Sequence, residues 1–177
     1  MPQVYVAVGS NVEPERHLGV AVAEIERLFG PIHSSAWYRN AAAGFSGADF
    51  INFVVSFETD LPAREVRARL QRIEEACGRP RNAPKWAPRA IDLDILLYGD
   101  QVSDEPGLVL PRPDLLRRAY MLGPLADLAP GLIHPTALAT IGELWQRFDR
   151  ESHPLVRVPA AVTSRRFDLR PPPESGQ

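Results

Sequence analysis

Apolar residues recur with two different spacings along the first hundred positions of this chain. A spacing of two residues, as at Val55 and Phe57, is typical of strands, and a spacing of three to four, as at Val66, Leu70 and Ile73, is typical of helices. The predicted strands cover residues 4–8, 32–38, 50–59 and 91–98, and the predicted helices cover residues 14–29 and 63–76. Strands and helices therefore follow one another in the order β-α-β-β-α-β.

This order is that of the ferredoxin-like class of α+β folds, in which two helices cover one face of an antiparallel sheet. Two additional C-terminal helices are predicted, one over residues 114–127 with a break at Pro124, and one over residues 137–148. Prolines then become frequent towards the end of the chain. We therefore expect a single domain over residues 1–154 and a Pro-rich tail over residues 155–177.

Composition narrows the classes of protein to which the chain can belong. Its 177 residues are 45% hydrophobic, enough to form one globular core. The net charge of -2 gives no reason to expect a nucleic-acid partner, and no apolar run is long enough to cross a membrane. Cys77 is the single cysteine, so no intrachain disulfide is expected. We expect a monomeric cytoplasmic protein.

Charges are unusually separated in the region that precedes and begins the fourth predicted strand. Residues 79–89 contain four cations and no acid, and Asp92 and Asp94 follow at once. Because prolines stand at every fourth position of this basic stretch, it is predicted to be a loop. In a strand, residues two apart share a face and lie about 6.5–7 Å apart, so the two carboxylates are predicted to project side by side.

Two neighbouring carboxylates repel each other unless a cation lies between them, and Mg²⁺ fits because it takes one or two carboxylates and completes its shell with water and phosphates. An ordinary polar strand face would give the same pattern, and paired aspartates also occur in sugar-nucleotide transferases and phosphatases. The basic loop adds guanidinium groups suited to phosphate oxygens, and Trp86 could cover a base or pterin ring. Together these features favour phosphoryl-type transfer, which depends on positioning and charge neutralisation.

Residues 85–96, KWAPRAIDLDIL, resemble the signature of the 6-hydroxymethyl-7,8-dihydropterin pyrophosphokinase family of the folate pathway. Other blocks resemble this family in order and spacing, namely VGSN at 8–11, FIN at 50–52, QRIE at 71–74 and AYML at 119–122. The resemblance extends over roughly residues 3–135. It implies transfer of pyrophosphate from ATP to 6-hydroxymethyl-7,8-dihydropterin, with release of AMP.

The resemblance also implies a site. Asp92 and Asp94 would bind two magnesium ions that bridge the ATP phosphates, and Arg79 and Arg89 would neutralise charge on the transferring group and the leaving AMP. The implied ATP-binding residues are Gln71, Glu74, Arg81, Trp86, Arg89, Ile95, Arg112 and Arg118. The implied pterin-binding residues are Asn40, Ala41, Ala43, Phe50, Asn52, Asp92 and Tyr120.

The chain departs from the family pattern at two places. Residues 40–47 replace a longer loop that usually contains a Thr-Pro-Pro-like segment. Pro111-Arg112 stands where the family commonly has Pro-His, and an arginine at this position can still bind a phosphate.

Three alternatives share parts of this pattern. An RNA-recognition module has the same order of elements, and residues 50–57 faintly resemble its aromatic strand, but the Gly-aromatic-Gly core is absent and the chain is acidic. A ferredoxin-like domain that binds a metabolite without catalysis would not need the concentrated arginines. Another nucleotidyl or phosphoryl transferase would release a different nucleotide product.

Overall fold

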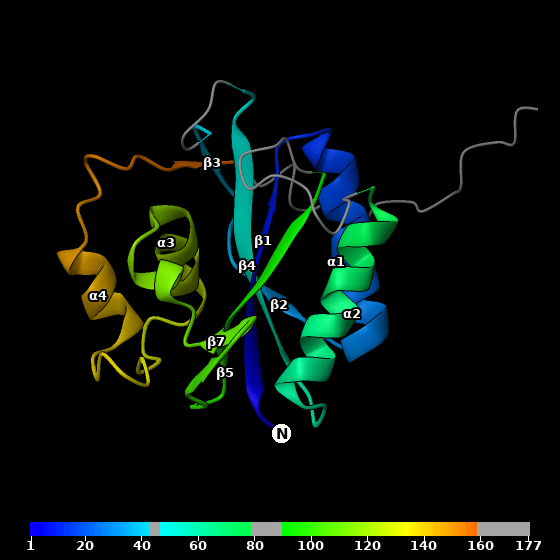
Figure 1. The fold of residues 1–177 in the computed structure, drawn as a ribbon. Helices are drawn as coiled ribbons and strands as arrows, with labels where there is room; N and C mark the ends of the chain where they lie inside the picture. Colours follow the sequence, from blue (N-terminus) through cyan, green and yellow to red (C-terminus); the bar gives the residue numbers. More distant parts are fainter. Residues whose placement is uncertain (43–46, 79–89, 159–177) are drawn as a thin grey trace, which may run out of the picture.

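The computed structural model describes residues 1–42, 47–78 and 90–158, which form a mixed α/β structure around an antiparallel sheet (Figure 1). The strands are β1 (Gln3–Ser10), β2 (His33–Ser34), β3 (Tyr38–Asn40), β4 (Phe50–Glu58), β5 (Asp92–Tyr98), β6 (Ser103–Glu105), β7 (Leu108–Leu110) and β8 (Val156–Arg157). The α-helices are α1 (Pro14–Phe29), α2 (Ala63–Ala76), α3 (Ala119–Leu128) and α4 (Ile141–Arg147), and Pro113–Leu116 form the 3₁₀ helix η1.

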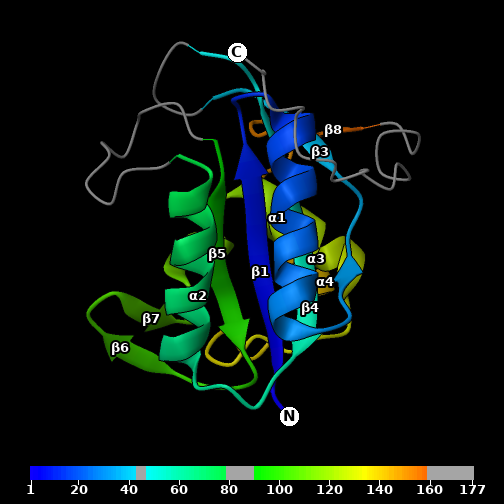
Figure 2. The ribbon, with the colours of Figure 1, turned by 90° about the vertical axis from the view of Figure 1, so that its right-hand side faces the viewer.

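The main sheet has the strand order β5-β1-β4-β3-β8, and β2 also pairs with β4. Neighbouring strands in this sheet are antiparallel. β1 and β4 occupy its centre and are buried along most of their length, which fits their nearly continuous apolar sequence. β6 and β7 form a separate hairpin beside the lower end of α2 (Figure 2).

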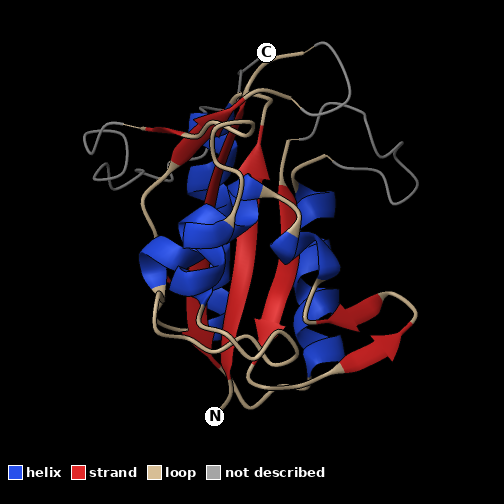
Figure 3. Ribbon diagram, turned by 90° about the vertical axis from the view of Figure 1, so that its left-hand side faces the viewer, coloured by secondary structure: helices blue, strands red, loops and turns tan. Residues whose placement is uncertain are grey.

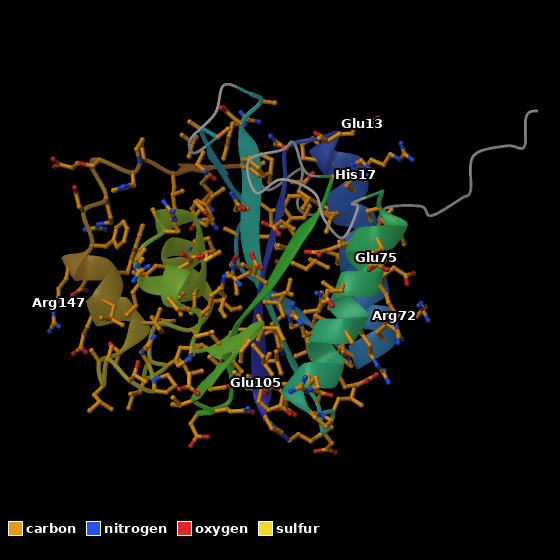
Figure 4. The ribbon with its side chains drawn as sticks, viewed as in Figure 1. Glu13, His17, Arg72, Glu75, Glu105 and Arg147 are labelled. Carbon is orange, nitrogen blue, oxygen red and sulfur yellow. The ribbon has the colours of Figure 1, made fainter. Side chains whose placement is uncertain are left out.

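Helices cover both faces of the sheet. α1 and α2 lie on one face (Figure 2), and α3 and α4 lie on the other (Figure 3). The alternation along β4 explains the two cores, because Phe53 and Val55 join the cluster under α1 and α2, whereas Val54 joins the cluster under α3. On α2, Leu70 faces the first core, while Arg72 projects away from the sheet (Figure 4).

The long periodic segments were predicted correctly. The two predicted helices at 14–29 and 63–76 have the bounds of α1 and α2, and the predicted strand at 50–59 is β4. α1 begins at a proline suited to the first turn and ends before Gly30, whose φ of 88° a residue with a side chain rarely adopts. The mixed α/β class and the antiparallel sheet are confirmed.

The predicted strand at 32–38 is wrong, because the chain forms two short strands, β2 and β3, instead of one. The interruption lies at Ser35, whose buried hydroxyl accepts a hydrogen bond from the Val54 N–H at 3.0 Å. A side chain thus takes the place of a backbone acceptor in the ladder. Trp37 then turns into the core and stacks on Phe53, with ring centroids 4.5 Å apart.

Both predicted C-terminal helices need correction. The break in the first lies at Arg118, which has the extended backbone of an N-cap, whereas Pro124 lies inside α3. The second begins at Ile141 rather than at residue 137, because Thr140 and Glu143 form a capping box. Before this cap, Leu138 has a φ of 55° that no helix accommodates.

Three short strands were not predicted. β6 and β7 hold three residues each, and an ion pair between Arg64 of α2 and Glu105 joins their hairpin to the helix. β8 pairs with β3, and the adjacent Val158 is buried, so residues 156–158 join the sheet although they belong to the predicted tail. The division into a domain and a tail itself stays a prediction. Within the described ranges, no helix is both long and apolar enough to cross a membrane.

Candidate active site

Polar groups gather on the α3 side of the sheet, where β5, β1 and β4 run side by side. Asp92 lies opposite Gly9 of β1, and Gly9 lies opposite Asn52 of β4. Asp94 follows on the same face of β5, because Leu93 between them is buried in the other core. The predicted placement of both aspartates side by side on one strand face is therefore confirmed.

Gly9 makes room for the Asn52 side chain. A Cβ atom at Gly9 would lie only 2.4 Å from Asn52 Oδ1, closer than any real contact of this kind. Asn52 is buried, and its Nδ2 donates a hydrogen bond to Asn40 Oδ1 at 2.6 Å. Two amides from the implied pterin set thus contact each other beside the aspartates.

A cavity of about 450 Å³ lies between α2, β5 and the β6–β7 hairpin. Its lining includes Asp94 and four residues implied for ATP binding, namely Gln71, Glu74, Ile95 and Arg112. The fold thus brings together residues from a helix, a strand and the segment after the hairpin. Arg67, Asp114 and residues 107–110 also line this cavity and were not predicted.

Arg112, which lines this cavity, lies between the carboxylates of Asp94 and Asp114. Its Nη1 lies 3.2 Å from Asp94 Oδ1, and its Nη2 lies 3.5 Å from Asp114 Oδ2. Its buried Nε has no hydrogen-bond partner among the described residues. In the same cavity, at the edge of β5, Glu74 Oε1 accepts a hydrogen bond from the Leu93 N–H at 2.8 Å.

A second cavity, of about 260 Å³, lies at the start of α3. It is lined by Asn40, Ala41 and Tyr120 from the implied pterin set, by Arg118, and by residues 152–155, which were not predicted. Burial raises the pKa of Tyr120, and the nearby carboxylates of Asp114, Asp92 and Asp94 raise it further, against the opposing charge of Arg118. The Tyr120 phenol therefore stays protonated and can donate a hydrogen bond at neutral pH.

The remaining implied residues are divided. Phe50 and Asn52 do not line the second cavity, although Asn52 reaches its edge through the hydrogen bond with Asn40. The following residues lie outside the described ranges, so their roles stay predictions: Ala43, Arg79, Arg81, Trp86 and Arg89. Sequence reasoning missed the hairpin, since strands of three residues carry little periodicity, although Pro106-Gly107 was a local turn signal between them. It also missed residues 152–155, which lie outside any helix or strand.

A carboxylate-bearing strand beside a cavity rimmed by arginines is the kind of site that phosphoryl-transfer enzymes use. The family comparison makes this class specific. A model of the 7,8-dihydro-6-hydroxymethylpterin-pyrophosphokinase (HPPK) family matches residues 5–130, and the chain belongs to this family.

Similar curated proteins carry the name 2-amino-4-hydroxy-6-hydroxymethyldihydropteridine pyrophosphokinase. The protein from Pseudomonas aeruginosa is 40% identical over 137 residues, which cover 75% of this chain and 84% of the relative. The protein from Synechocystis is 35% identical over 147 residues, covering 81% of this chain and 75% of the relative. The protein from Haemophilus influenzae is 34% identical over 152 residues, covering 84% and 94%.

Solved structures share the fold. A crystal structure of HPPK-DHPS in complex with substrates superposes with a TM-score of 0.67 at 13% identity, covering 85% of this chain and 44% of the other. Wild-type HPPK-DHPS of Plasmodium falciparum gives a TM-score of 0.67 at 13% identity, covering 85% and 46%. This chain spans less than half the length of those proteins, and the likeness at this identity concerns the fold alone.

Proposed function

We propose that this chain transfers pyrophosphate from ATP to 6-hydroxymethyl-7,8-dihydropterin in folate biosynthesis, giving AMP and the pterin diphosphate. Family membership supports this activity. The observation on which the proposal rests most is the common cavity of Asp94, Arg112, Gln71 and Glu74. Two carboxylates, one guanidinium and one amide from these four residues face a space large enough for part of a nucleotide.

Magnesium fits the donor set on β5. Asp92 and Asp94 are half-buried and offer hard oxygen donors, and Mg²⁺ typically binds one or two carboxylates plus substrate phosphates. Within the described residues, no group of three or more acids, histidines or cysteines is placed to hold a metal ion. The substrate phosphates would therefore have to supply the remaining ligands. Two magnesium ions belong to the proposal; Asp92 and Asp94 would hold them, and when bound they would neutralise phosphate charge.

The ATP site would use both the described cavity and the basic loop. Glu74 and Gln71 of α2 are proposed to bind the nucleoside, and Ile95 to contact it from the strand. Arg112 is proposed to donate to a phosphate oxygen, and Arg118, from the start of α3, to add a second cation. From outside the described ranges, Arg81 and Trp86 are proposed to bind ATP, and Arg79 and Arg89 to neutralise charge in the transition state.

The pterin site would lie on the sheet beside Asp92. Phe50 and Tyr120 are proposed to hold the ring between aromatic faces, and Asn52 to bind its amide edge. Backbone near Asn40 and Ala41, and near Ala43 outside the described ranges, would complete this site. Asp92 would then face both the metal and the hydroxymethyl group of the pterin. The reacting alcohol would thereby lie beside the phosphates.

Three structural expectations belong to the same proposal. A ferredoxin-like topology is supported by the order β5-β1-β4-β3, with the β2 and β3 pieces together taking the place of the second strand. A cytoplasmic location and a monomeric state are proposed with it.

The nucleotide product tests the function directly. Protein incubated with ATP, magnesium and 6-hydroxymethyl-7,8-dihydropterin should release AMP in proportion to the pterin diphosphate, because pyrophosphate moves as one unit. Asp94→Ala should abolish turnover, whereas Asp104→Ala, on the exposed face of β6, should leave it unchanged. Release of ADP, or no product from the unaltered chain, would overturn the proposal.

A further inference from the structure

The carboxylate proposed to bind magnesium already has a cation beside it. Asp94 Oδ1 lies 3.2 Å from Arg112 Nη1, and both side chains are only partly exposed, 20% for Asp94 and 35% for Arg112. Partial burial strengthens such a pair relative to one on the open surface. A divalent ion that approaches Asp94 therefore encounters the guanidinium at close range.

The backbone of Arg112 is held at this place, while its side chain has a second partner. The Arg112 N–H donates to the Leu96 carbonyl of β5 at 2.9 Å, and prolines at 111 and 113 restrict the backbone on either side. Asp114 Oδ2 lies 3.5 Å from Nη2. The guanidinium can thus leave Asp94 by rotation of its own side chain and still keep the pair with Asp114.

The present hydrogen bonding of Arg112 is incomplete. Nε is buried without a partner among the described residues, and an unsatisfied buried donor is unfavourable. Phosphate oxygens accept two parallel hydrogen bonds from a guanidinium, which would use donors that the two carboxylates leave unused. An arginine with spare donors at the edge of the cavity is therefore poised to exchange a carboxylate for a phosphate.

We propose that Arg112 is a counter-ion that competes with the divalent cation for Asp94 and so makes metal binding depend on the nucleotide. Without nucleotide, Arg112 neutralises Asp94 and repels the metal. With nucleotide, the phosphates attract both cations, and Asp114 retains the guanidinium next to them. The coupling is reciprocal, since a nucleotide that helps the metal to bind is itself helped by the metal. This inference rests on the proposed function.

Metal binding to the nucleotide-free protein tests the inference without any measurement of turnover. Free Mn²⁺, counted by electron paramagnetic resonance during titration, should bind Arg112→Gln about tenfold more tightly than the unaltered chain, because one repelling charge is gone. A non-hydrolysable ATP analogue should reduce or reverse this gain. Arg147→Gln is the matched control, since Arg147 projects into solvent from α4, away from β5 (Figure 4). Unchanged or weaker Mn²⁺ binding by Arg112→Gln would overturn the inference.

Asp114 supplies a second test with the opposite sign. Asp114→Asn should weaken Mn²⁺ binding, because the guanidinium is then held by Asp94 with less competition. In Arg112→Gln/Asp114→Asn the asparagine should have no additional effect, since Asp114 acts through Arg112. A persistent loss in the double variant would show that Asp114 binds the metal itself and would contradict the role assigned to it. AMP release by the unaltered chain separates these results from a failure of the proposed function.

Discussion

Gly9 and Asn52 lie opposite each other on neighbouring strands, and only one of the two positions can carry a side chain toward the site. Asn52 Oδ1 occupies the space that a Cβ of Gly9 would need, at 2.4 Å. The amide nitrogen of Asn52 is fixed by Asn40 at 2.6 Å. The absence of a side chain at Gly9 thus allows the orientation of Asn52, the residue on the next strand that is proposed to bind the pterin.

Gly9→Ala should therefore impair pterin binding more than ATP binding. The new methyl group displaces the Asn52 amide, and the loss of one hydrogen bond to the ligand corresponds to a KM for the pterin raised by at least about tenfold. The KM for ATP should change much less. Gly131→Ala is the control, since nothing lies within 4 Å of a Cβ at Gly131. Equal pterin KM values for the two variants would contradict this account of Gly9.

His134 is a buried residue whose neutral form the fold requires. Its Nδ1 accepts hydrogen bonds from the Thr136 N–H at 3.3 Å and the Ala137 N–H at 3.1 Å, and burial lowers its pKa from 6.5. A protonated Nδ1 could accept neither. The unfolded chain therefore protonates His134 more readily than the native protein does. The free energy of unfolding consequently rises as the pH increases toward and past 6.5.

We expect the free energy of unfolding to fall as the pH is lowered below the ordinary histidine pKa of 6.5. Urea unfolding at several pH values between about 7.5 and 5.5 measures the slope. His134→Gln keeps an acceptor oxygen but does not titrate, so its slope should be smaller than that of the unaltered chain. The same slope in both proteins would show that other groups cause the pH dependence.

At the scale of elements, α2 completes the open edge of β5. β5 ends the sheet, and the outward N–H of Leu93, between the two aspartates, donates to Glu74 of α2 at 2.8 Å. An exposed strand edge without such a partner is prone to shift or to pair elsewhere. The helix therefore helps to fix the strand segment that presents the proposed metal ligands.

Glu74→Ala should lower kcat/KM for ATP by about tenfold, whereas Glu74→Gln should stay close to the unaltered chain, because an amide oxygen can still accept from Leu93. Initial rates over a range of ATP and magnesium concentrations measure both. If Glu74→Gln were as impaired as Glu74→Ala, the negative charge rather than the hydrogen bond to β5 would be the functional feature.

The sequence predicted those elements whose pattern extends over several turns or residues. α1 and α2 have the predicted bounds, since each places apolar residues on one face for three or more turns. Local side-chain bonds decided the errors: the Ser35 hydroxyl splits the predicted second strand, and Thr140 starts α4 late. The Thr140 to Glu143 spacing is a readable capping signal that would have corrected the second error.

The site was predictable only in part, for a related reason. A strand period of two puts Asp92 and Asp94 on one face, and α2 and β5 are long enough to locate Gln71 and Glu74 beside them. The contact of Arg112 with Asp114 depends instead on how the chain turns after a three-residue strand. No periodicity encodes that turn.

At the scale of the whole molecule, the C-terminal segment closes one side of the second cavity. Residues 152–155 line it, and β8 then pairs with β3. Leu155 packs on α3 because Gly123 has no side chain, as a Cβ there would lie 2.8 Å from Leu155 Cδ1. The segment is thus anchored at a helix and at the sheet edge, on both sides of the cavity.

Leu155→Ala should loosen this wall. We expect a KM for the pterin raised about threefold to fivefold, an unchanged KM for ATP, and a loss of about 1–2 kcal/mol in the free energy of unfolding, since Leu155 is half-buried. Steady-state kinetics well below the unfolding temperature separate the first effect from the last. Leu138→Ala is the control, because Leu138 is 79% exposed. If both variants had the same pterin KM, the segment would have no part in substrate binding.

The row formed by Asp92, Gly9 and Asn52 has a consequence for how the protein gains its activity during refolding. The row draws on β5, β1 and β4, so no fragment that lacks one of these strands contains it. A slip of β5 by one residue would turn both carboxylates toward α2 and leave the chain compact but inert. After dilution from denaturant, turnover should therefore return only when all three strands have paired in the correct register. It should return later than the initial collapse of the chain.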